Sequence, residues 1–310
     1  MSTFIRLTTN ALILVIGLTA GIASARSADV NDPNTCASIW SRIGLPQHPA
    51  RLEPNTTYVC HQRYIVEHNN EMKTPDWVIE RLTPAIVTGD NPRPSVGFKS
   101  EPNVPEAAQA VPTDYGKSGF AVGHQAPSAD FKSADALMRD TFFFSNAVPQ
   151  VGIGFNTGIW SSLERLVQKL AMDRREIFVI TGPVYQSDHE VTIPAESDAC
   201  RHQIVLPKRD PLTVCKARNL DRAVKCTDGV AVPAALFKVV YLPGQGVNAY
   251  VFPNIDHRPL KKKTKSLEYL KQYRVGLNSV EALTGYRFLT KFTPRRQRQL
   301  KEQCVATFLH

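Results

Sequence analysis

The sequence has no CxxC pair, no internal repeat, no low-complexity tract and, after residue 25, no apolar run long enough to cross a bilayer. The first absence argues against a zinc-thiolate site and a redox motif, because both use closely spaced cysteines. The next two argue against a repeat protein and a disordered chain. The last argues against a membrane-spanning segment in the mature protein.

Residues 1–25 are typical of a cleaved signal peptide. They carry one charge, Arg6, followed by the apolar run Ala11–Ile22 and the small residues Ala23-Ser24-Ala25. The alternative is an uncleaved anchor, but the run is about a dozen residues, short of the roughly 20 that a spanning helix needs. We therefore expect one mature domain, residues 26–310, that is periplasmic or secreted and not bound to a membrane.

The six cysteines are expected to form three disulfides, because an exported protein folds in an oxidising compartment. The sequence does not choose among the pairings. Two pairs are close along the chain, which leaves a third: Cys36 with Cys60, Cys215 with Cys226, and Cys200 with Cys304.

The chain is basic, with a net charge of +9 that becomes +8 when Arg6 is removed with the leader. An excess of Lys and Arg suits a polyanionic partner such as nucleic acid. Basic charge also serves solubility, so it does not identify the partner by itself.

The residue pattern predicts an α+β fold, with a mixed, mainly antiparallel sheet flanked by helices. The predicted strands lie in Tyr58–His68, Trp77–Val87, Phe142–Ser145 and Glu176–Thr181, and Phe237–Leu242 with Asn248–Pro253 reads as a hairpin. An amphipathic helix is expected over Asn156–Asp173, a basic helix from Pro294, and a long proline-rich loop over Asn91–Thr113.

Two segments carry residues suited to phosphodiester hydrolysis: residues 115–131, which contain His124, and residues 145–164, which contain Asn156 and Glu164. This reaction needs a base to activate water, an electrophile at the leaving oxygen and a cation near the non-bridging oxygens. An unperturbed imidazole has a pKa near 6.5 and can serve as the base.

These segments resemble the DNA/RNA non-specific endonuclease family, whose ββα-metal site combines a strand, a loop and a helix. The family's Asp-Arg-Gly-His motif, followed by Ala-Pro, stands here as Ala121-Val122-Gly123-His124-Gln125-Ala126-Pro127. A second motif is matched at Asn146, Pro149, Gln150, Phe155, Asn156, Trp160, Leu163 and Glu164. Weaker matches at Thr74–Trp77 and Glu281–Gly285 extend the likeness from about Cys60 to about Phe288.

The resemblance implies that His124 is the general base and that Asn156 is the metal ligand. The expected ion is Mg²⁺, with Mn²⁺ as a substitute, because one amide oxygen plus water suits a hard octahedral cation. Glu164 is expected to orient the ion's water shell. It lies about two turns after Asn156, so both side chains should fall on one edge of the helix. In isolation, Asn156 would read as a helix cap and Glu164 as a solvated residue.

One departure concerns the first motif, where Ala121 and Val122 replace an acidic residue and an arginine expected to bind phosphate. Arg93 matches a second arginine of the family loosely, and Lys117 lies close to the motif in sequence. Either could supply the missing charge. Asn146 and Gln150 are candidates for binding substrate or, equally well, for holding the catalytic loop by hydrogen bonds.

Further basic residues indicate a non-specific track for the nucleic-acid backbone, with a solvated surface as the alternative. They are Lys261, Lys262, Lys263 and Lys265, and the pair Arg174 and Arg175. We therefore expect an exported, Mg²⁺-dependent nuclease that cuts DNA and RNA internally and, by resemblance, leaves 5′-phosphates. The alternatives are a narrower phosphodiesterase and a catalytically impaired nucleic-acid-binding protein.

Overall fold

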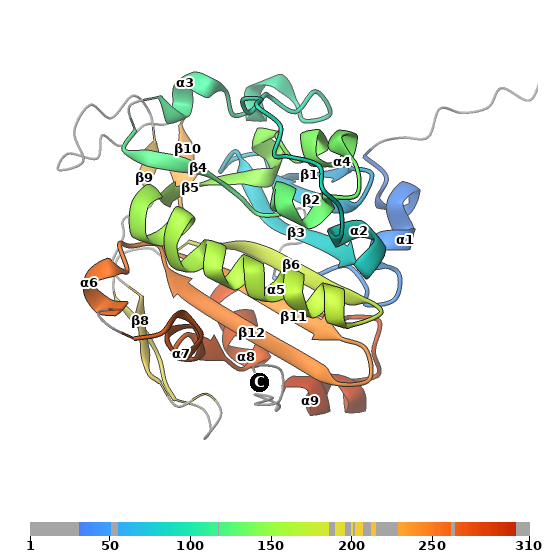
Figure 1. Ribbon diagram of the computed structural model, residues 1–310, viewed down its shortest axis with the longest axis vertical. Helices are drawn as coiled ribbons and strands as arrows, with labels where there is room; N and C mark the ends of the chain where they lie inside the picture. The colour runs from blue at the N-terminus through green and yellow to red at the C-terminus, as the bar shows by residue number, and fades with distance from the viewer. Residues whose placement is uncertain are drawn as a thin grey trace, which may run out of the picture.

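The fold is built on a seven-strand antiparallel sheet in the order β1-β2-β3-β6-β11-β12-β13 (Figure 1). Its strands are β1 Thr56–Cys60, β2 Tyr64–Asn69, β3 Thr74–Leu82, β6 Ile177–Val184, β11 Ala235–Leu242, β12 Gly246–Pro253 and β13 Arg274–Val275. This computed structural model describes residues 31–50, 55–116, 118–185, 190–195, 200, 202–206, 212–214, 229–261 and 264–301.

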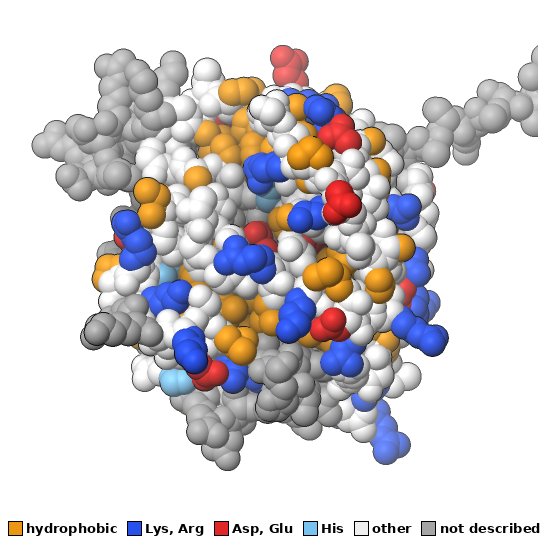
Figure 2. All heavy atoms as spheres, viewed as in Figure 1, with side chains coloured by type: hydrophobic (Ala, Val, Ile, Leu, Met, Phe, Trp, Pro, Cys, Tyr) orange, Lys and Arg blue, Asp and Glu red, His pale blue; other side chains and the backbone are white. Residues whose placement is uncertain are grey.

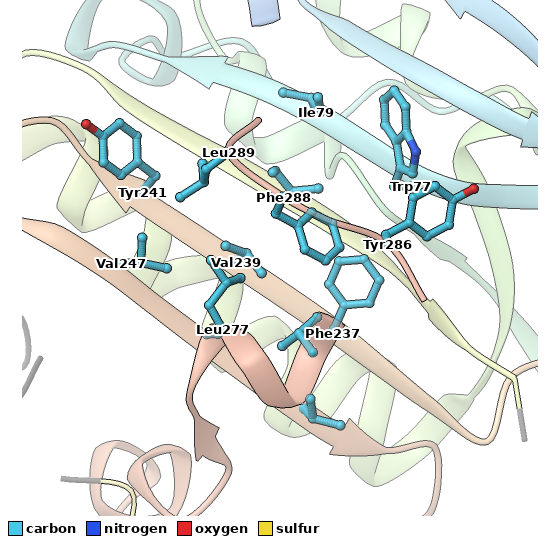
Figure 3. Packing of buried hydrophobic residues seen from close by; sticks show 14 of the residues in the cluster. Trp77, Ile79, Phe237, Val239, Tyr241, Val247, Leu277, Tyr286, Phe288 and Leu289 are labelled. Carbon is cyan, nitrogen blue, oxygen red and sulfur yellow. The ribbon is translucent and has the colours of Figure 1, made fainter. Parts of the chain in front are cut away.

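The two faces of the sheet are covered by different elements. Alternating side chains on β3, β6 and β11 form one apolar layer that includes Trp77, Ile79 and Phe237 (Figure 3). This layer packs against α8 Leu277–Thr284, the residues around Tyr286, and α9 Pro294–Lys301. The opposite face packs against α5 Ser161–Asp173, which crosses the sheet in Figure 1.

The α5 helix is amphipathic, and its repeat of apolar residues explains its position. Leu163, Val167, Leu170 and Ala171 are buried, whereas Arg165 and Lys169 are exposed. Burying this stripe against the sheet stabilises the helix more than its intrinsic propensity does. The exposed residues thereby form the outer surface on this side of the protein.

The residues between β3 and β6, 83–176, form a single excursion from two neighbouring strands of the sheet. It contains a second small sheet, made of β4 Phe120–His124 and β5 Ala147–Val151. Its helical elements are α2 Pro84–Val87, η2 Glu106–Ala108, α3 Pro112–Tyr115, η3 Ser128–Phe131, α4 Asp135–Asp140, η4 Phe144–Asn146, the π-helical segment η5 Gly152–Trp160, and α5.

The remaining elements are short. They are η1 Pro33–Cys36, α1 Ala37–Trp40, β7 Val191–Ile193, β8 Ile204–Leu206, β9 Leu212–Val214, β10 Val230–Val232, α6 Arg258–Lys261 and α7 Ser266–Lys271. None of the helices in the described part of the chain has the length and apolarity that crossing a membrane requires.

Several predictions of local structure are confirmed, among them the α+β class, the strand at Glu176–Thr181, the hairpin of β11 and β12, and the basic helix from Pro294. Three were wrong in detail. Tyr58–His68 is not one strand, because the chain turns at residues 61–63 to form the β1–β2 hairpin. The strand predicted over Trp77–Val87 ends at Leu82, and Pro84–Val87 is helical; Phe142–Ser145 leads into η4 instead of forming a strand.

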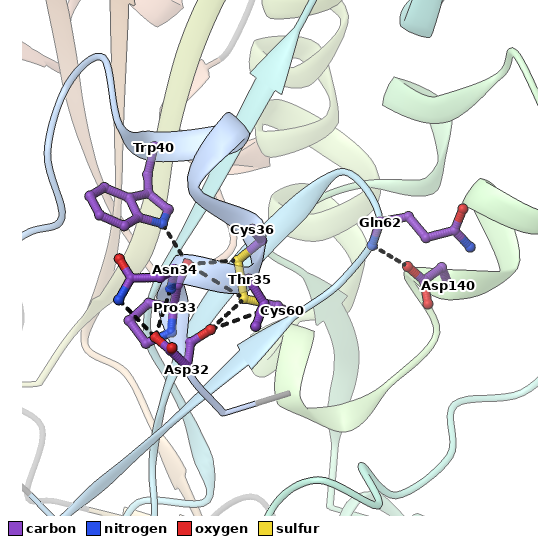
Figure 4. The surroundings of a disulfide bond; sticks show 9 residues. All are labelled: Asp32, Pro33, Asn34, Thr35, Cys36, Trp40, Cys60, Gln62 and Asp140. Atoms are coloured by element: carbon purple, nitrogen blue, oxygen red, sulfur yellow. Dashed lines mark hydrogen bonds between the residues drawn. A yellow bond between two sulfur atoms is a disulfide. The ribbon is translucent and has the colours of Figure 1, made fainter. Parts of the chain in front are cut away.

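The predicted pairing of Cys36 with Cys60 is present and joins η1 to the end of β1 (Figure 4). The indole nitrogen of Trp40 donates a 2.9 Å hydrogen bond to the Pro33 carbonyl beside it. Cys200 is also disulfide-bonded, while Cys215, Cys226 and Cys304 lie outside the described residues.

Candidate active site

His124 is the last residue of β4 and pairs with Ala147 of β5. Gly123, directly before it, has to be small, because a Cβ there would lie 2.0 Å from the Cδ atom of Gln150. The glycine of the motif thus lets β4 approach the buried Gln150 side chain. This packing fixes the backbone that carries His124.

The His124 ring is held between two aromatic side chains. Its centroid lies 4.5 Å from that of Phe98 and 4.8 Å from that of Phe142, the second contact being edge-to-face. The Nε2 atom is buried and has no hydrogen-bond partner among the described residues. The imidazole is therefore positioned by packing.

Burial, together with the positive charge of Arg93, lowers the pKa of His124 to about 3. A low pKa means that the ring is neutral at pH 7 and has a free lone pair. The unprotonated nitrogen is what a general base needs, and the low pKa makes this imidazole a weaker base than a free one.

Asn146 is fully buried and joins the segment after His124 to η4. Its side-chain oxygen accepts a hydrogen bond from the Ala126 amide at 2.9 Å, and its Nδ2 donates to the Ala126 and Thr141 carbonyls. These bonds support the structural role that the sequence left open. Gln150 is also fully buried, and neither the oxygen nor the nitrogen of its side-chain amide has a hydrogen-bond partner in the described part of the chain.

Asn156 lies in η5, which follows β5 directly and therefore enters the site beside β4. The side chain is half-buried and has no hydrogen-bond partner among the residues that the structure describes. It is not a helix cap, because the N-cap of α5 is Trp160. An amide oxygen in this setting is free to bind an ion.

The expectation of one continuous helix from Asn156 to Asp173 was wrong. Gly158 has φ −108° and ψ −107°, which interrupts the helix before α5 begins at Ser161. Gly154 adopts φ +90°, a conformation that favours glycine. Asn156 thus sits on a tight turn between two glycines, and Glu164 follows in the first turn of α5.

Glu164 is half-buried on α5 and faces a polar cluster beneath the helix. Burial raises the pKa of its carboxyl to about 8, against the lowering effect of the Lys238 ammonium. The next residue, Arg165, donates hydrogen bonds to Ser161 at 2.8 Å and Ser162 at 2.9 Å. Its charge also favours the ionised form of Glu164.

Arg93 lies in the loop after α2, and its side chain reaches the neighbourhood of His124. Its guanidinium carbon is 5.1 Å from the ring centroid of Phe142, which also contacts His124. The positive charge lowers the pKa of both His124 and Glu164. The structure therefore brings Arg93, His124 and Glu164 together, although they are far apart in the sequence.

Val122, which replaces the motif arginine, belongs to an apolar cluster. It is half-buried and packs with Phe98, Tyr115 and Phe144, on the same side of β4 as His124. This position provides no positive charge. The cations that act on His124 or Glu164 are instead Arg93, Arg165 and the buried Lys238.

A buried charged cluster lies under α5 that the sequence did not predict; it is formed by Glu80 on β3, Asp130 on η3 and Lys238 on β11. The Lys238 ammonium donates a 2.6 Å hydrogen bond to Thr181 and lies 5.2 Å from the Trp160 ring centroid. Burial raises the pKa of Asp130 to about 6. The available signal was a single lysine within the apolar strand at residues 235–242.

Among the other predicted basic residues, those that the structure describes lie on α6, at the start of α7, or after α5. Lys117, Lys262 and Lys263 lie outside the described residues. Lys261 donates a 2.8 Å hydrogen bond to Ser266, and Lys265 is the N-cap of α7. Arg174 and Arg175 follow the far end of α5.

Figure 2 shows the surface of the protein from the side of α5. A hollow above the helix contains a histidine and an acidic side chain, with Lys and Arg side chains around it. Such a surface suits a negatively charged strand lying across the site.

The donors of the candidate site fit a hard divalent cation held mainly by water. Asn156 presents a free amide oxygen, and Glu164 a carboxyl group whose ionised form a bound cation would favour; both offer the oxygen ligands that Mg²⁺ prefers. No group of three His, Cys, Asp or Glu side chains that could hold an ion occurs among the described residues. An ion here would keep most of its hydration shell.

Comparisons with known proteins identify nucleases that are similar in sequence and a solved structure that is similar in fold. The profile of the family described as DNA/RNA non-specific endonuclease matches residues 47–294. Similar proteins include the mitochondrial nuclease of Saccharomyces cerevisiae, 30% identical over 249 residues (77% of this chain, 67% of that protein). Nuclease C1 of Cunninghamella echinulata is 29% identical over 261 residues (82% and 91%).

Among solved structures, a chain of the crystal structure of the EndoG/EndoGI complex has the same fold. Its TM-score is 0.64 at 24% sequence identity, covering 86% of this chain and 95% of that chain.

Proposed function

We propose a mechanism from one premise: the chain belongs to the DNA/RNA non-specific endonuclease family and is a metal-dependent nuclease that hydrolyses phosphodiester bonds. We infer further that it cuts both DNA and RNA with Mg²⁺, for which Mn²⁺ can substitute. The observation that carries this proposal is the convergence of His124, Glu164 and Arg93 beside the turn that holds Asn156.

In this proposal Asn156 holds the ion through its amide oxygen, and Glu164 orients the bound water. When bound, a divalent cation offsets negative charge on the phosphate and on the leaving oxygen. The turn between Gly154 and Gly158 sets the direction of the Asn156 side chain.

His124 takes a proton from the attacking water. Because its Nε2 is buried, we infer that Nδ1 is the nitrogen that water reaches. The contacts with Phe98 and Phe142 hold the ring in a fixed orientation, which lowers the entropic cost of aligning base and water.

Arg93 supplies the positive charge that the motif arginine would have provided. A guanidinium can donate two parallel hydrogen bonds to the non-bridging oxygens of a phosphate. Its proximity to both His124 and Glu164 supports this role.

A narrower phosphodiesterase is the second candidate, and the position of Val122 favours it. An apolar cluster around this residue removes one phosphate contact expected for a general nuclease. Such an enzyme would accept fewer substrates or turn them over more slowly.

Export is part of the proposal. The Cys36–Cys60 disulfide suggests a compartment outside the cytosol. The proposed signal peptide, residues 1–25, lies outside the described residues, and residues 26–310 are the proposed mature domain. Periplasmic or secreted location can be tested by fractionating cells and sequencing the mature N-terminus.

The decisive experiment is digestion of supercoiled plasmid and of RNA by the mature protein, with Mg²⁺ and with excess chelator. Cleavage of both substrates, lost with chelator, is the expected result. Asn156→Ala should remove most activity, and His124→Ala should lower it by about 10²–10⁴-fold. The exposed His202→Ala is the matched control and should be active.

Full activity in chelator would refute the metal assignment, and near-normal rates for His124→Ala would place the base elsewhere. Binding of nucleic acid without cleavage under every condition would identify an impaired binding protein.

A further inference from the structure

A pocket of about 640 Å³ lies at the far end of α5 from Asn156. Its walls come from the end of β3, the link between α5 and β6, the β11–β12 hairpin, and Arg42, which follows α1. The charged residues that line it are Arg42, Arg81, Asp173, Arg174, Arg175 and Glu176, four cations against two carboxylates.

Positive charge in this pocket exceeds negative charge. Glu176 is engaged on both oxygens, since it accepts a 2.6 Å hydrogen bond from Arg81 and also pairs with Arg42. Arg81 is fixed further by a 3.0 Å bond to the Ser38 carbonyl. One carboxylate therefore holds two guanidinium groups in place.

Arg174 and Arg175 have no carboxylate partner within the part of the chain that the structure describes. The Nε atom of Arg174 is buried and has no hydrogen-bond acceptor there, so no described protein group holds this guanidinium in place. The donors of the two guanidinium groups that face the pocket are therefore available to an anion.

The pocket is connected to the candidate active site by the exposed face of α5. Arg165 and Lys169 lie on that face between Glu164 and Arg174. At about 1.5 Å per residue, Glu164 and the end of α5 are about 14 Å apart along the helix axis. Figure 2 shows Lys and Arg side chains spread over this side of the molecule.

We propose that the arginine pocket binds a backbone phosphate of the nucleic-acid substrate, about two to three nucleotides from the bond that is cut. The inference rests on the proposed function. Phosphates of one strand rise about 3.4 Å each along the duplex axis but also wind around it, so their separation through space is larger and about 14 Å spans fewer than four of them. Two unpaired guanidinium groups match the oxygens of one phosphate.

The test compares two substrates: a trinucleotide, which is too short to reach the pocket, and a 30-base-pair duplex. The double variant R174Q/R175Q removes the two unpaired charges. The control R295Q/R298Q removes the same charge from exposed positions on α9, which packs on the opposite face of the sheet. Thermal unfolding establishes that both variants are folded.

R174Q/R175Q should raise KM for the duplex about tenfold and lower the slope of log affinity against log salt by about two. Its kcat on the duplex and its kinetics on the trinucleotide should stay within about twofold of the parent, as expected for a phosphate contact that only positions the substrate. The control should match the parent on both substrates.

A duplex KM that is unchanged, or that rises equally in the control, would overturn the proposal. Free phosphate is the other source of the same chemistry. If calorimetry shows inorganic phosphate binding that R174Q/R175Q abolishes, while the duplex KM is unchanged, the pocket serves small anions. If the parent cuts neither substrate, the proposed function fails; fluorescence anisotropy of the duplex then tests the pocket by itself.

Discussion

At the scale of single residues, Val122 shows how an active site can lose one charge and keep its geometry. Val122 and Phe98 both pack against the buried cluster that contains Tyr115 and Phe144, and Phe98 also contacts the His124 ring. A valine at this position therefore extends the apolar side of the candidate site. In the proposed mechanism the positive charge comes from another loop, through Arg93, which is close enough to His124 to lower its pKa.

Arg93→Ala should lower kcat by about 10²–10³-fold with a smaller effect on KM, because removing one preorganised donor mainly affects the transition state. Steady-state kinetics on a duplex would measure this. Val122→Arg in the Arg93→Ala background should restore part of the rate, since both positions are near His124.

The control is Arg139→Ala, which removes an exposed arginine paired with Asp135 on α4. A silent Arg93→Ala, combined with a sharp rate increase in Val122→Arg alone, would mean that the natural protein has no compensating cation. The narrower phosphodiesterase would then be the better description.

At the scale of elements, η5 places the strictest requirement on the sequence, because its backbone at Gly154 adopts a conformation that favours glycine. Gly154 has φ +90°, and a Cβ there would lie 2.0 Å from the Oδ1 atom of Asp256. Asp256 accepts hydrogen bonds from Arg258 in an exposed ion pair and can move, but the positive φ strains any residue that has a Cβ. The turn that carries Asn156 thus depends on a glycine.

Gly154→Ala should shift η5 and reduce activity by at least about tenfold, with a loss of stability of about 1–3 kcal/mol from the strained backbone. Activity at increasing Mg²⁺ and denaturant unfolding would measure the two effects. Gly116→Ala is the control, because its φ is −61° and an added Cβ would make only ordinary contacts. Wild-type metal dependence in Gly154→Ala would show that the turn does not set the Asn156 position.

The same segment also shows which part of the fold could not be predicted from the sequence. Periodicity identified the apolar stripe of α5 and the β11–β12 hairpin, because both follow from local spacing. It extended the helix back to Asn156, since apolar spacing does not register the backbone angles of Gly154 and Gly158. The motif residues were found by resemblance, but the cluster of Glu80, Asp130 and Lys238 comes from three distant elements that only the fold brings together.

At the scale of the whole molecule, His61 links the β1–β2 hairpin to two segments of the excursion. Its Nε2 lies 3.3 Å from Glu101 and its Nδ1 3.3 Å from Asp140, while the ring stacks on Tyr64. Burial disfavours the charged ring, but the bonds to Asp140 and Glu101 outweigh it and raise the pKa of His61.

A raised pKa sets the direction of the pH dependence. His61 stabilises the fold fully below its unfolded pKa of about 6.5, and this contribution is lost as the pH rises through the higher folded value. Thermal unfolding between pH 6 and 10 should show the parent losing about 2–4 °C more than His61→Gln. Parallel curves for the two proteins would contradict a charged His61.

The Cys36–Cys60 disulfide is a second feature that affects the stability of the whole fold. Removing it in C36S/C60S should cost about 2–5 kcal/mol of unfolding free energy, the usual effect of losing a native disulfide. Urea unfolding with and without reductant would measure this, and reductant should destabilise the parent. Free thiols at all six cysteines in the native protein would refute the expectation of disulfides.

The excursion between β3 and β6 has a consequence for how activity is acquired during folding. Arg93, His124, Asn156 and Glu164 all lie within residues 83–176, and their neighbourhood exists only when β6 pairs with β3. Closing so long a loop is entropically unfavourable and makes folding slow. A refolding chain should therefore remain inactive while its local helices and hairpins form, and should recover cleavage together with the pairing of these two strands.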